Sequence, residues 1–280
     1  MDRIEQVKGS VIQHGPHNNR IYLMRLNTND TRGLIATLDE MAVKNGYGKI
    51  FARIPATSWK AFKSADYIKE AVVPGFYTGK TDGFFIAKFF SASRQKSPIV
   101  DSLSGLVRGT EARAEKNSQR TDRAAREIIA CQPSDAEQMS GLYQNVFKSY
   151  PFPIQDPAYL RRQMQEGVPY YCIRMGGSIA AVAATEIDQA SNTAEMTDFA
   201  TLPKWQGRGF AGMLLIFMDR KVRTDGIKTS YTIARADSRV MNTVFRNRGY
   251  SYAGLLKNNS QIGGSIQSMT VWYKHLSRHR

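Results

Sequence analysis

The pattern of apolar and polar positions after residue 126 predicts an alternation of strands and helices. Short apolar runs bounded by Gly, Pro, Asn or Asp indicate strands, whereas apolar residues spaced by three and four positions indicate helices. The chain from the strand in REIIACQ to the strand in SIQSMTVWYK then has the order β-α-β-β-β-α-β-α-β-β. This order predicts an α/β domain of roughly 150 residues, with one sheet flanked by helices.

Local signals support individual elements. Ser134 precedes Glu137 by three residues, the spacing of a capping box, which predicts the start of the first helix. Gly176 and Gly177 separate two β-rich segments and predict a hairpin turn. Apolar side chains recur at helical spacing up to Arg223. We interpret them as the core face of a helix and give them no functional role.

The first half of the chain weakly resembles the second. Residues 33–54 are predicted to form a helix and then a strand, as are residues 209–235. Two aromatic matches repeat at an offset of 183 residues: Phe62 with Phe245, and Tyr67 with Tyr250. A repeat on this scale predicts the duplication of a half-domain.

These patterns divide the chain into three parts. Residues 1–107 are expected to form a non-catalytic α/β domain, a degenerate copy of part of the second domain. Residues 108–126 are polar, which predicts a linker or an exposed helix, and residues 127–280 form the second domain. Asp30 stands in the first half where Gln206 stands in the second, and an acid there would repel phosphate. We therefore expect the first half to be structural or to shape a substrate site.

The composition is that of a globular protein. Of the 280 residues, 42% are hydrophobic and 22% are charged, which excludes an intrinsically disordered chain. The sequence has no apolar run long enough to span a membrane, and its first residues do not resemble a secretory signal. Cys131 and Cys172 are too few for a disulfide framework, so we expect a cytoplasmic protein. The cysteines and the four scattered histidines lack metal-ligand spacing, and we expect no metal.

A net charge of +15 indicates either an anionic partner or a basic surface that binds no partner. Basic proteins bind nucleic acids, anionic surfaces or polyanionic small molecules. Much of the excess lies in residues 108–126 and in the C-terminal HLSRHR, and such runs are most often solvated faces or frayed ends. Charge alone does not select a partner, and we expect neither a nucleic acid nor a membrane.

The stretch LPKWQGRGFAGMLL, residues 202–215, places glycines and an arginine where a helix should begin. The first N–H groups of a helix have no partner within it, and the helix dipole makes that end electropositive. Glycines let a diphosphate approach the backbone closely, and Arg208 adds a fixed positive charge. The chain has neither Gly-x-Gly-x-x-Gly after its first strand nor a Gly-x-x-x-x-Gly-Lys-Ser/Thr loop. The segment therefore predicts a phosphate-bearing ligand of another class.

QGRGFA resembles Gln/Arg-x-x-Gly-x-Gly/Ala, the acetyl-CoA signature of the GNAT superfamily of N-acetyltransferases. The preceding FATLP and the later NTVFRNRGY are similar to neighbouring segments of that superfamily, and the likeness covers residues 126–276. It implies the GNAT fold, a mixed and mostly antiparallel sheet, with acetyl-CoA as the co-substrate. The residues that it implies at the acetyl-CoA site are Thr201, Leu202, Gln206, Gly207, Arg208, Gly209, Phe210, Ala211, Asn242, Phe245 and Arg246.

Acetyl transfer to an amine needs a base, because an amine with a pKa near ~10.4 is protonated at neutral pH. Glu195, our candidate, lies eleven residues before the signature. This spacing is similar to that of the base glutamate in the histone-acetylating branch of the superfamily. Strand alternation places Glu195 and Thr197 on one face and Asp198 on the other. Glu186 and Asp188, on the neighbouring strand, are alternatives.

The transition state also needs hydrogen-bond donors for the carbonyl oxygen under attack. The resemblance implies backbone N–H groups near the end of the cofactor strand, those of Thr201 and Leu202. The superfamily often has a tyrosine four residues before the late glycine, as the acid for the departing thiol, but this chain has Phe245 there. A thiol with a pKa near ~8.5 leaves with little help, and Tyr250 and Tyr252 are fallback donors.

Longer stretches indicate the acceptor. YPFPIQDPAYL, LLKNNSQIGG and SMTVWYK, with the two-part architecture, resemble the β-lysine N-acetyltransferase family over nearly the whole chain. The resemblance implies transfer to the terminal amine of β-lysine, the product of lysine 2,3-aminomutase, giving a compatible solute for osmoadaptation. Tyr150, Phe152 and Asp156, with Glu195, are the candidate substrate residues. Another small amine, protein lysines, and a catalytically silent RNA- or partner-binding role stay open as alternatives.

Overall fold

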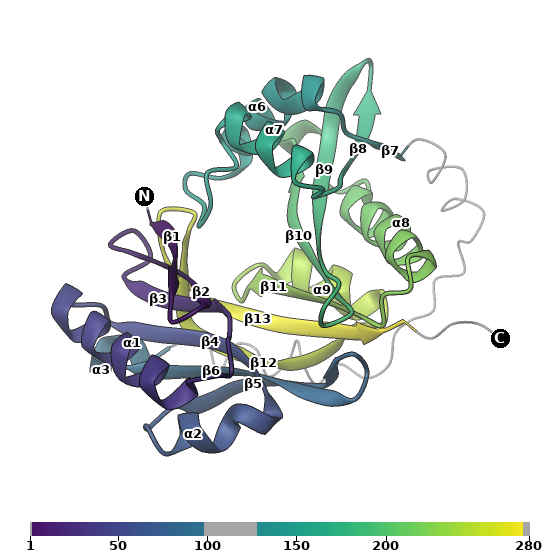
Figure 1. The fold of residues 1–280 in the computed structure, drawn as a ribbon. Coiled ribbons are helices and arrows are strands. Elements are labelled where there is room, and N and C mark those ends of the chain that lie inside the picture. Colours follow the sequence, from purple (N-terminus) through teal and green to yellow (C-terminus); the bar gives the residue numbers. More distant parts are fainter. Residues whose placement is uncertain (1, 98–127, 277–280) are drawn as a thin grey trace.

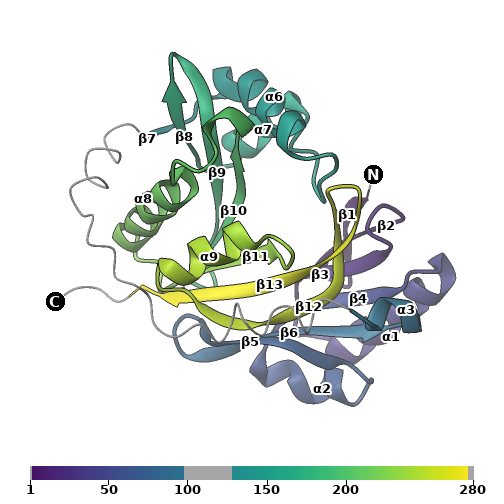
Figure 2. The same cartoon turned by 180° about the vertical axis from the view of Figure 1, so that it is seen from behind.

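The structure is a computed structural model that describes residues 2–97 and 128–276. The predicted linker, 108–126, and both expected domain boundaries, at 107 and 127, lie outside the described residues. The described strands form a single thirteen-stranded sheet with helices packed against it, which confirms the α/β class (Figure 1, Figure 2). No helix in 2–97 or 128–276 is long and apolar enough to cross a membrane.

The first half of the chain supplies one end of the sheet. Its strands are β1 (Arg3–Val7), β2 (Ser10–Gly15), β3 (Arg20–Arg25), β4 (Lys49–Pro55), β5 (Ile68–Tyr77) and β6 (Thr81–Phe89). Its helices are α1 (Thr31–Asn45), α2 (Trp59–Lys63) and α3 (Ala92–Gln95), with the 3-10 turn η1 (Ala56–Ser58) before α2. The sequence patterns predicted α1 and β4 but gave no signal for β1 to β3.

The second half supplies the other end. Its strands are β7 (Ile128–Ala130), β8 (Tyr170–Met175), β9 (Ser178–Asp188), β10 (Thr193–Thr201), β11 (Thr229–Arg235), β12 (Ser251–Ile262) and β13 (Ser265–His275). Its helices are α6 (Ala136–Val146), α7 (Pro157–Gln165), α8 (Phe210–Thr224) and α9 (Arg239–Asn247), and its 3-10 turns are η2 (Pro133–Asp135) and η3 (Pro203–Trp205). The predicted order is confirmed, except that it omits α7.

Strand alternation in β9 builds two cores, one on each face of the sheet. Ala181 and Ala183 pack with the buried face of α8, whereas Val182 and Ala184 pack under α6 and α7. Figure 1 shows α8 on one side of β8–β10 and the α6–α7 pair on the other. The strand is therefore apolar on both faces, as expected for a sheet covered on both sides.

The helix that begins the second half starts differently from the prediction. Residues Pro133 to Asp135 form a 3-10 turn before α6. The Asp135 carboxylate accepts the Gln132 N–H at 2.9 Å, so the acidic residue that closes the turn is Asp135. The predicted capping pair, Ser134 with Glu137, is wrong because the proline shifts the first turn by two residues.

The two halves of the sheet mirror each other about the contact between β5 and β12. The strand order is β3-β4-β6-β5 on one side and β12-β13-β11-β10 on the other. In each half one pair is parallel, β3 with β4 and β10 with β11. A helix, α1 or α8, connects the two strands of that pair. This arrangement supports the predicted duplication of a half-domain.

A repeated side-chain network supports the same conclusion. In the first half, Tyr67 donates to Asp39 of α1 at 3.3 Å, and Lys88 donates to the same carboxylate at 2.7 Å. The corresponding residue types form these bonds in the second half, where Tyr250 and Lys274 donate to Asp219 of α8. Each network joins a hairpin, β5–β6 or β12–β13, to the helix of the same half, α1 or α8. The division into two separate domains stays a prediction, since the sheet runs through both halves.

The halves join at a close backbone approach. Gly254 of β12 pairs with Ala71 of β5, and a side chain at Gly254 would lie 2.1 Å from the Glu70 carbonyl oxygen. Beside this contact, Lys49 and Glu70 form an ion pair of 2.7 Å whose side chains are 0% and 1% exposed. Only glycine fits at position 254, because its φ is +155° and the neighbouring backbone occupies the space of a Cβ atom.

We expect Gly254→Ala to lower the free energy of unfolding by about 3 kcal/mol, since the added carbon collides with backbone that cannot move alone. Gly264→Ala is the matched control, because Gly264 has φ of +96° with open space around it and should cost only about 1 kcal/mol. Chemical denaturation of both variants measures the difference. Equal losses would mean that the β5–β12 contact does not constrain the junction.

Candidate active site

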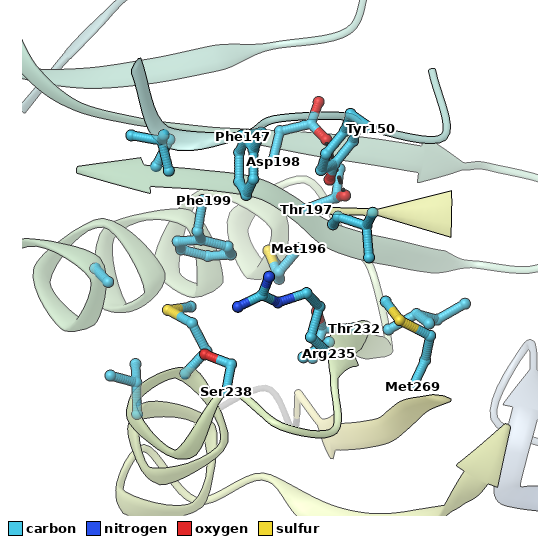
Figure 3. Close-up of a pocket in the computed structure, with 18 of the residues that line it drawn as sticks. Phe147, Tyr150, Met196, Thr197, Asp198, Phe199, Thr232, Arg235, Ser238 and Met269 are labelled. Atoms are coloured by element: carbon cyan, nitrogen blue, oxygen red, sulfur yellow. Dashed lines mark hydrogen bonds between the residues drawn. The ribbon is translucent and has the colours of Figure 1, made fainter. Parts of the chain in front are cut away.

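A cavity of about 810 Å³ opens where β10 and β11 separate. The two strands pair in parallel only at Thr193, Ala194 and Glu195, although both continue further. Backbone groups beyond Glu195 therefore face a gap instead of a neighbouring strand. The walls come from β10, β11, α9, the start of α8 and the α6–α7 loop, and also from β3, β4 and β12. Figure 3 shows part of this lining.

The glycine-rich segment 206–211 lies on the cavity wall. α8 begins at Phe210 with Gly209 as its N-cap, and no side chain caps the helix. Gly207 and Gly209 have φ of +77° and +79°, and a side chain added at either would meet no atom within 4 Å. Gln206 and Arg208 are exposed. The first N–H groups of α8 are thus accessible to a ligand, a geometry that fits a diphosphate.

The corresponding helix of the first half is closed by its own side chain. Asp30 is the N-cap of α1, and its carboxylate accepts the Gly33 N–H at 2.9 Å. Lys8 pairs with the same carboxylate at 2.9 Å. Asp30 therefore already satisfies the kind of backbone group that a phosphate would need, which agrees with the expected lack of a phosphate site there.

A bulge in β10 changes the expected alternation of its side chains. The register with β9 shifts between Thr197 and Ala200, so Asp198 and Phe199 together oppose one residue. The Asp198 backbone has φ of +56°, and Figure 3 shows its side chain beside Tyr150 in the cavity. Glu195 lines the same cavity. The prediction that Asp198 lies on the opposite face is therefore wrong, because one extra residue resets the alternation.

Both carboxylates are held by tyrosines. Tyr231 donates to Glu195 Oε2 at 2.7 Å, and Arg53 of β4 donates to the Tyr231 hydroxyl oxygen. Tyr150, from the α6–α7 loop, donates to Asp198 Oδ1 at 2.8 Å. The first half thus reaches Glu195 through one intermediate side chain.

Burial makes these carboxylates stronger bases than usual. It raises the pKa of Asp198 to about 6, although the bonds from Tyr150 and Thr197 favour the charged form. Burial also raises the pKa of Glu195, opposed by the Tyr231 hydrogen bond and the Arg53 charge. A base whose pKa approaches neutrality accepts a proton efficiently at neutral pH.

Of the two alternatives on β9, one shares the site. Glu186 lines the cavity and is accessible from it. Partial desolvation inside the cavity, with the charges of Glu195 and Asp198, raises the pKa of Glu186. Asp188 is not among the lining residues and lies 3.9 Å from Arg53. Three carboxyl groups therefore converge on one wall.

The candidate substrate residues also differ in whether they line the cavity. Tyr150 and Phe152 line the cavity. Asp156 does not, since it is the exposed N-cap of α7 and its carboxylate accepts the Ala158 N–H at 2.9 Å. The prediction of Asp156 as an ammonium partner is therefore not supported by the geometry: its side chain is used to start a helix.

The two backbone N–H groups expected to bind the carbonyl oxygen under attack differ in whether they are already hydrogen-bonded. The Leu202 N–H is already bonded to the Ala180 carbonyl at 3.0 Å, so Leu202 has no free donor and does not line the cavity. Thr201, one residue earlier, lines the cavity. Because alternate residues of an antiparallel strand direct their amides to opposite sides, its N–H points away from β9. The bulge at Asp198 and Phe199 also leaves backbone groups outside the ladder.

α9 contributes fewer site residues than expected. Phe245 lines the cavity and packs edge-on against Phe199. Asn242 is 0% exposed; its amide nitrogen donates to the Ser238 carbonyl, and its oxygen accepts from Trp272. Its polar atoms join α9 to the sheet, so none is left for acetyl-CoA. Arg246 is not among the lining residues.

The fallback tyrosines are also outside the cavity. Tyr250 donates to Asp219 at 2.7 Å and is buried, while Tyr252 is half-buried and packs edge-on against Trp272. Neither lines the cavity. The side chain at the usual position of the acid is therefore Phe245, with no replacement among these tyrosines.

Several lining residues had no signal in the sequence. Arg235 and Ser238, at the end of β11 and the start of α9, face the cavity opposite Phe199 and Met196 (Figure 3). Arg20 and Tyr22 come from β3, a strand that no pattern predicted. Nothing local marks these positions, because their role depends on strands that meet only in the folded sheet.

Comparisons with known proteins agree with this geometry. Residues 138–250 match the Acetyltransferase (GNAT) family. Over 98% of this chain and 99% of its own length, a β-lysine N(6)-acetyltransferase of Methanococcus maripaludis is 34% identical to it. The chain belongs to the GNAT acetyltransferase family. A second β-lysine N(6)-acetyltransferase, of Methanosarcina mazei, is 26% identical over 87% of this chain and 97% of its own. The N-acetyltransferase YodP of Bacillus subtilis is 27% identical over 75% and 76%.

The family membership confirms the GNAT fold, the enzyme class and acetyl-CoA as co-substrate. The open start of α8 and the space at Gly207 and Gly209 fit the diphosphate of that co-substrate. Within 2–97 and 128–276, no group of three or more His, Cys, Asp or Glu side chains is arranged to hold a metal ion.

We expect Gly209→Ala to raise the Kd for acetyl-CoA about tenfold and to destabilise the protein by about 1 kcal/mol, because a Cβ atom at φ of +79° is strained and enters the ligand's space. Gly226→Ala, past the other end of α8, is the control, since its φ is +84° and it also has open space. Calorimetric titration should show the affinity change for Gly209→Ala alone. Equal effects of both variants on affinity would remove the diphosphate from the start of α8.

Proposed function

We propose that this GNAT enzyme transfers acetyl from acetyl-CoA to the terminal amine of β-lysine, giving N6-acetyl-β-lysine. One observation carries the proposal: the open start of α8 and the carboxylates of β10 face a single cavity. The near full-length likeness to two proteins named β-lysine N(6)-acetyltransferase supports the choice of acceptor. The acceptor is a cation at its reacting end, which the three carboxyl groups complement.

Glu195 is the proposed base. A terminal amine with a pKa near ~10.4 must lose a proton before it attacks, and Glu195 takes it directly or through a water molecule. Tyr231 fixes one carboxylate oxygen of Glu195, which leaves the other for the amine. Asp198, held by Tyr150, adds negative charge that attracts the ammonium group into the cavity, and Glu186 lines the same wall.

The remaining groups act on the acetyl donor. When bound, acetyl-CoA supplies the acetyl group as a thioester. The Thr201 N–H, with backbone groups of the β10 bulge, donates to the carbonyl oxygen as negative charge develops there. The amides at the start of α8, with Arg208, hold the diphosphate. Phe245 contacts the ligand as a packing surface, and the thiol leaves without a side-chain acid because its own pKa is near ~8.5.

The wider setting follows from the acceptor and stays a prediction. An enzyme that uses β-lysine works beside lysine 2,3-aminomutase, which produces it, and in the cytoplasm, where acetyl-CoA is made. Acetylation replaces an ammonium group with a neutral amide, so the product can accumulate without a counter-ion. A role as a compatible solute in osmoadaptation is therefore part of the proposal.

Two rival functions use the same fold. The first is acetylation of another small amine or of protein lysines, which the same base and donors would catalyse. The second is a silent protein that binds RNA or a partner, suggested by the net charge of +15 and by Phe245. The open N-cap at Gly209 speaks against the second, because a silent protein has no need of a helix start that no side chain caps.

We expect acetyl-CoA-dependent thiol release with β-lysine to exceed that with α-lysine, polyamines or a basic peptide by at least tenfold in kcat/KM. A thiol-reactive dye measures release, and mass spectrometry identifies the acetylated nitrogen. A filter-binding assay with RNA over a salt series is run beside it. A preference for the peptide would overturn the acceptor, and tight RNA binding without thiol release would overturn the enzyme.

We expect Glu195→Gln to lower kcat by about 10²- to 10⁴-fold, the usual range for loss of a general base, with the Kd for acetyl-CoA unchanged. The base must be ionised, so kcat/KM of the wild type should rise with pH through the raised pKa of Glu195. Asp198→Asn removes a neighbouring negative charge that raises this pKa, and should shift the rise to lower pH.

The control is Asp156→Asn, since Asp156 is an exposed cap outside the cavity and should keep the pH profile of the wild type. Unchanged turnover in Glu195→Gln would show that another group accepts the proton. A Glu195→Gln variant that instead lost acetyl-CoA affinity would assign Glu195 to binding.

A further inference from the structure

The wall that the first half contributes holds a buried arginine without an anionic partner. Arg20 of β3 lines the cavity and is 3% exposed. Its Nη1 donates to the Asn259 carbonyl oxygen at 2.6 Å and to the Ser260 hydroxyl at 2.9 Å. Its Nε is buried and has no hydrogen-bond partner among the described residues. No carboxylate in 2–97 or 128–276 forms an ion pair with it.

This arrangement is costly unless an anion completes it. Burial lowers the pKa of Arg20 only to about 10, so the guanidinium is charged at neutral pH. Lys49, buried in the same junction, is neutralised by Glu70 at 2.7 Å, whereas Arg20 is not. The rings of Tyr22 and Phe51 lie 5.3 and 5.6 Å from the guanidinium carbon and hold it in place. A fixed, buried, unpaired cation on a cavity wall is suited to a carboxylate.

Next to Arg20, Asn259 presents a hydrogen-bond acceptor. This residue of β12 lines the same cavity and is 1% exposed. Its Oδ1 is buried and has no partner among the described residues, and its own carbonyl oxygen binds Arg20. An unpaired acceptor beside an unpaired cationic donor matches a carboxylate beside an ammonium group.

We propose that Arg20 and Asn259 bind the amino-acid head group of the acceptor, with Arg20 on its carboxylate and Asn259 Oδ1 on the adjacent β-ammonium. This inference rests on the proposed function and deepens it. The head group is then recognised by β3 of the first half and by β12, which joins the halves. Specificity for an amino acid over a simple diamine arises from residues outside the acetyl-transfer machinery.

The reacting amine then lies toward the opposite wall. Tyr22 is two residues from Arg20 on β3, and so on the same face of the strand. Arg20 on β3 and Glu195 on β10 come from different halves of the sheet and line the same cavity. The cavity thus receives a cationic group from the first half and an anionic group from the second. An acceptor with a carboxylate at one end and an amine at the other fits this polarity.

The test compares matched acceptors in the full-length protein. β-Lysinamide replaces the carboxylate of β-lysine with a neutral amide, and 6-aminohexanoate removes the β-amine but keeps the carboxylate. We expect the wild type to favour β-lysine over β-lysinamide by about 10- to 100-fold in kcat/KM, as for a charged hydrogen-bonded pair. Arg20→Gln should lower kcat/KM for β-lysine by a similar factor, mainly through KM, and change that for β-lysinamide less than threefold.

Asn259→Ala should give the complementary result. It keeps the backbone carbonyl that binds Arg20, and removes the acceptor for the β-ammonium. We expect it to abolish the preference for β-lysine over 6-aminohexanoate while retaining the preference over β-lysinamide. Arg94→Gln is the matched control, since Arg94 is 6% exposed in the same junction and does not line the cavity; it should keep both preferences.

The outcomes separate this inference from the proposed function. If the wild type acetylates β-lysine but does not discriminate against β-lysinamide, the head-group site is wrong and the proposed function stands. If Arg20→Gln lowers kcat/KM equally for β-lysine and β-lysinamide, Arg20 has a structural role alone. If the wild type prefers a peptide to β-lysine, the proposed function itself fails. The wild-type comparison needs no variant, so it decides the question even if Arg20→Gln does not fold.

Discussion

The separation of β10 from β11 after Glu195 is the constraint on which the rest of the structure depends. A parallel pair normally continues for as long as both strands run, because each unpaired backbone group costs free energy. Here the pairing ends at Glu195, and the cavity lies beyond that point. The bulge at Asp198 follows on β10 and brings Asp198 to the same face of the strand as Glu195. The separation of the strands thus gives space for the ligands, and the bulge adds Asp198 to the carboxyl groups that line it.

The electrostatics of the cavity follow from how the two halves meet. Carboxylates come from β9 and β10, which belong to the second half alone, and the unpaired arginine comes from β3 of the first. Arg53 of β4 donates to Tyr231, which in turn donates to Glu195. The first half therefore contributes charge to the site, while Asp30 closes the start of its own helix α1. Its expected role in shaping a substrate site agrees with these contacts.

The sequence was informative where a local pattern decides the local structure. Strand and helix periodicity predicted the elements of the second half, and the glycines at 207 and 209 predicted an open helix start, since a positive φ there requires them. Prediction failed where distant contacts decide. In a regular strand, alternation would direct the Asp198 side chain to the face opposite Glu195. The bulge instead places both side chains on the same face. Asn242, which the resemblance implied at the acetyl-CoA site, accepts a hydrogen bond from Trp272 thirty residues away. Asp156 failed for a local reason, because its carboxylate caps α7. No pattern in the sequence marked Arg20 as a site residue, because its contact with β12 forms only in the folded sheet.

The closed start of α1 has a consequence for how many donor molecules one chain can hold. Duplication of a half-domain could in principle yield two equivalent nucleotide sites, yet Asp30 folds back on the Gly33 amide of α1 while Gly209 leaves α8 bare. A single aspartate thus occupies, at the start of α1, the place that a phosphate would need. Of these two helices only α8 presents an open start, and a second diphosphate would have to displace the Asp30 carboxylate from α1.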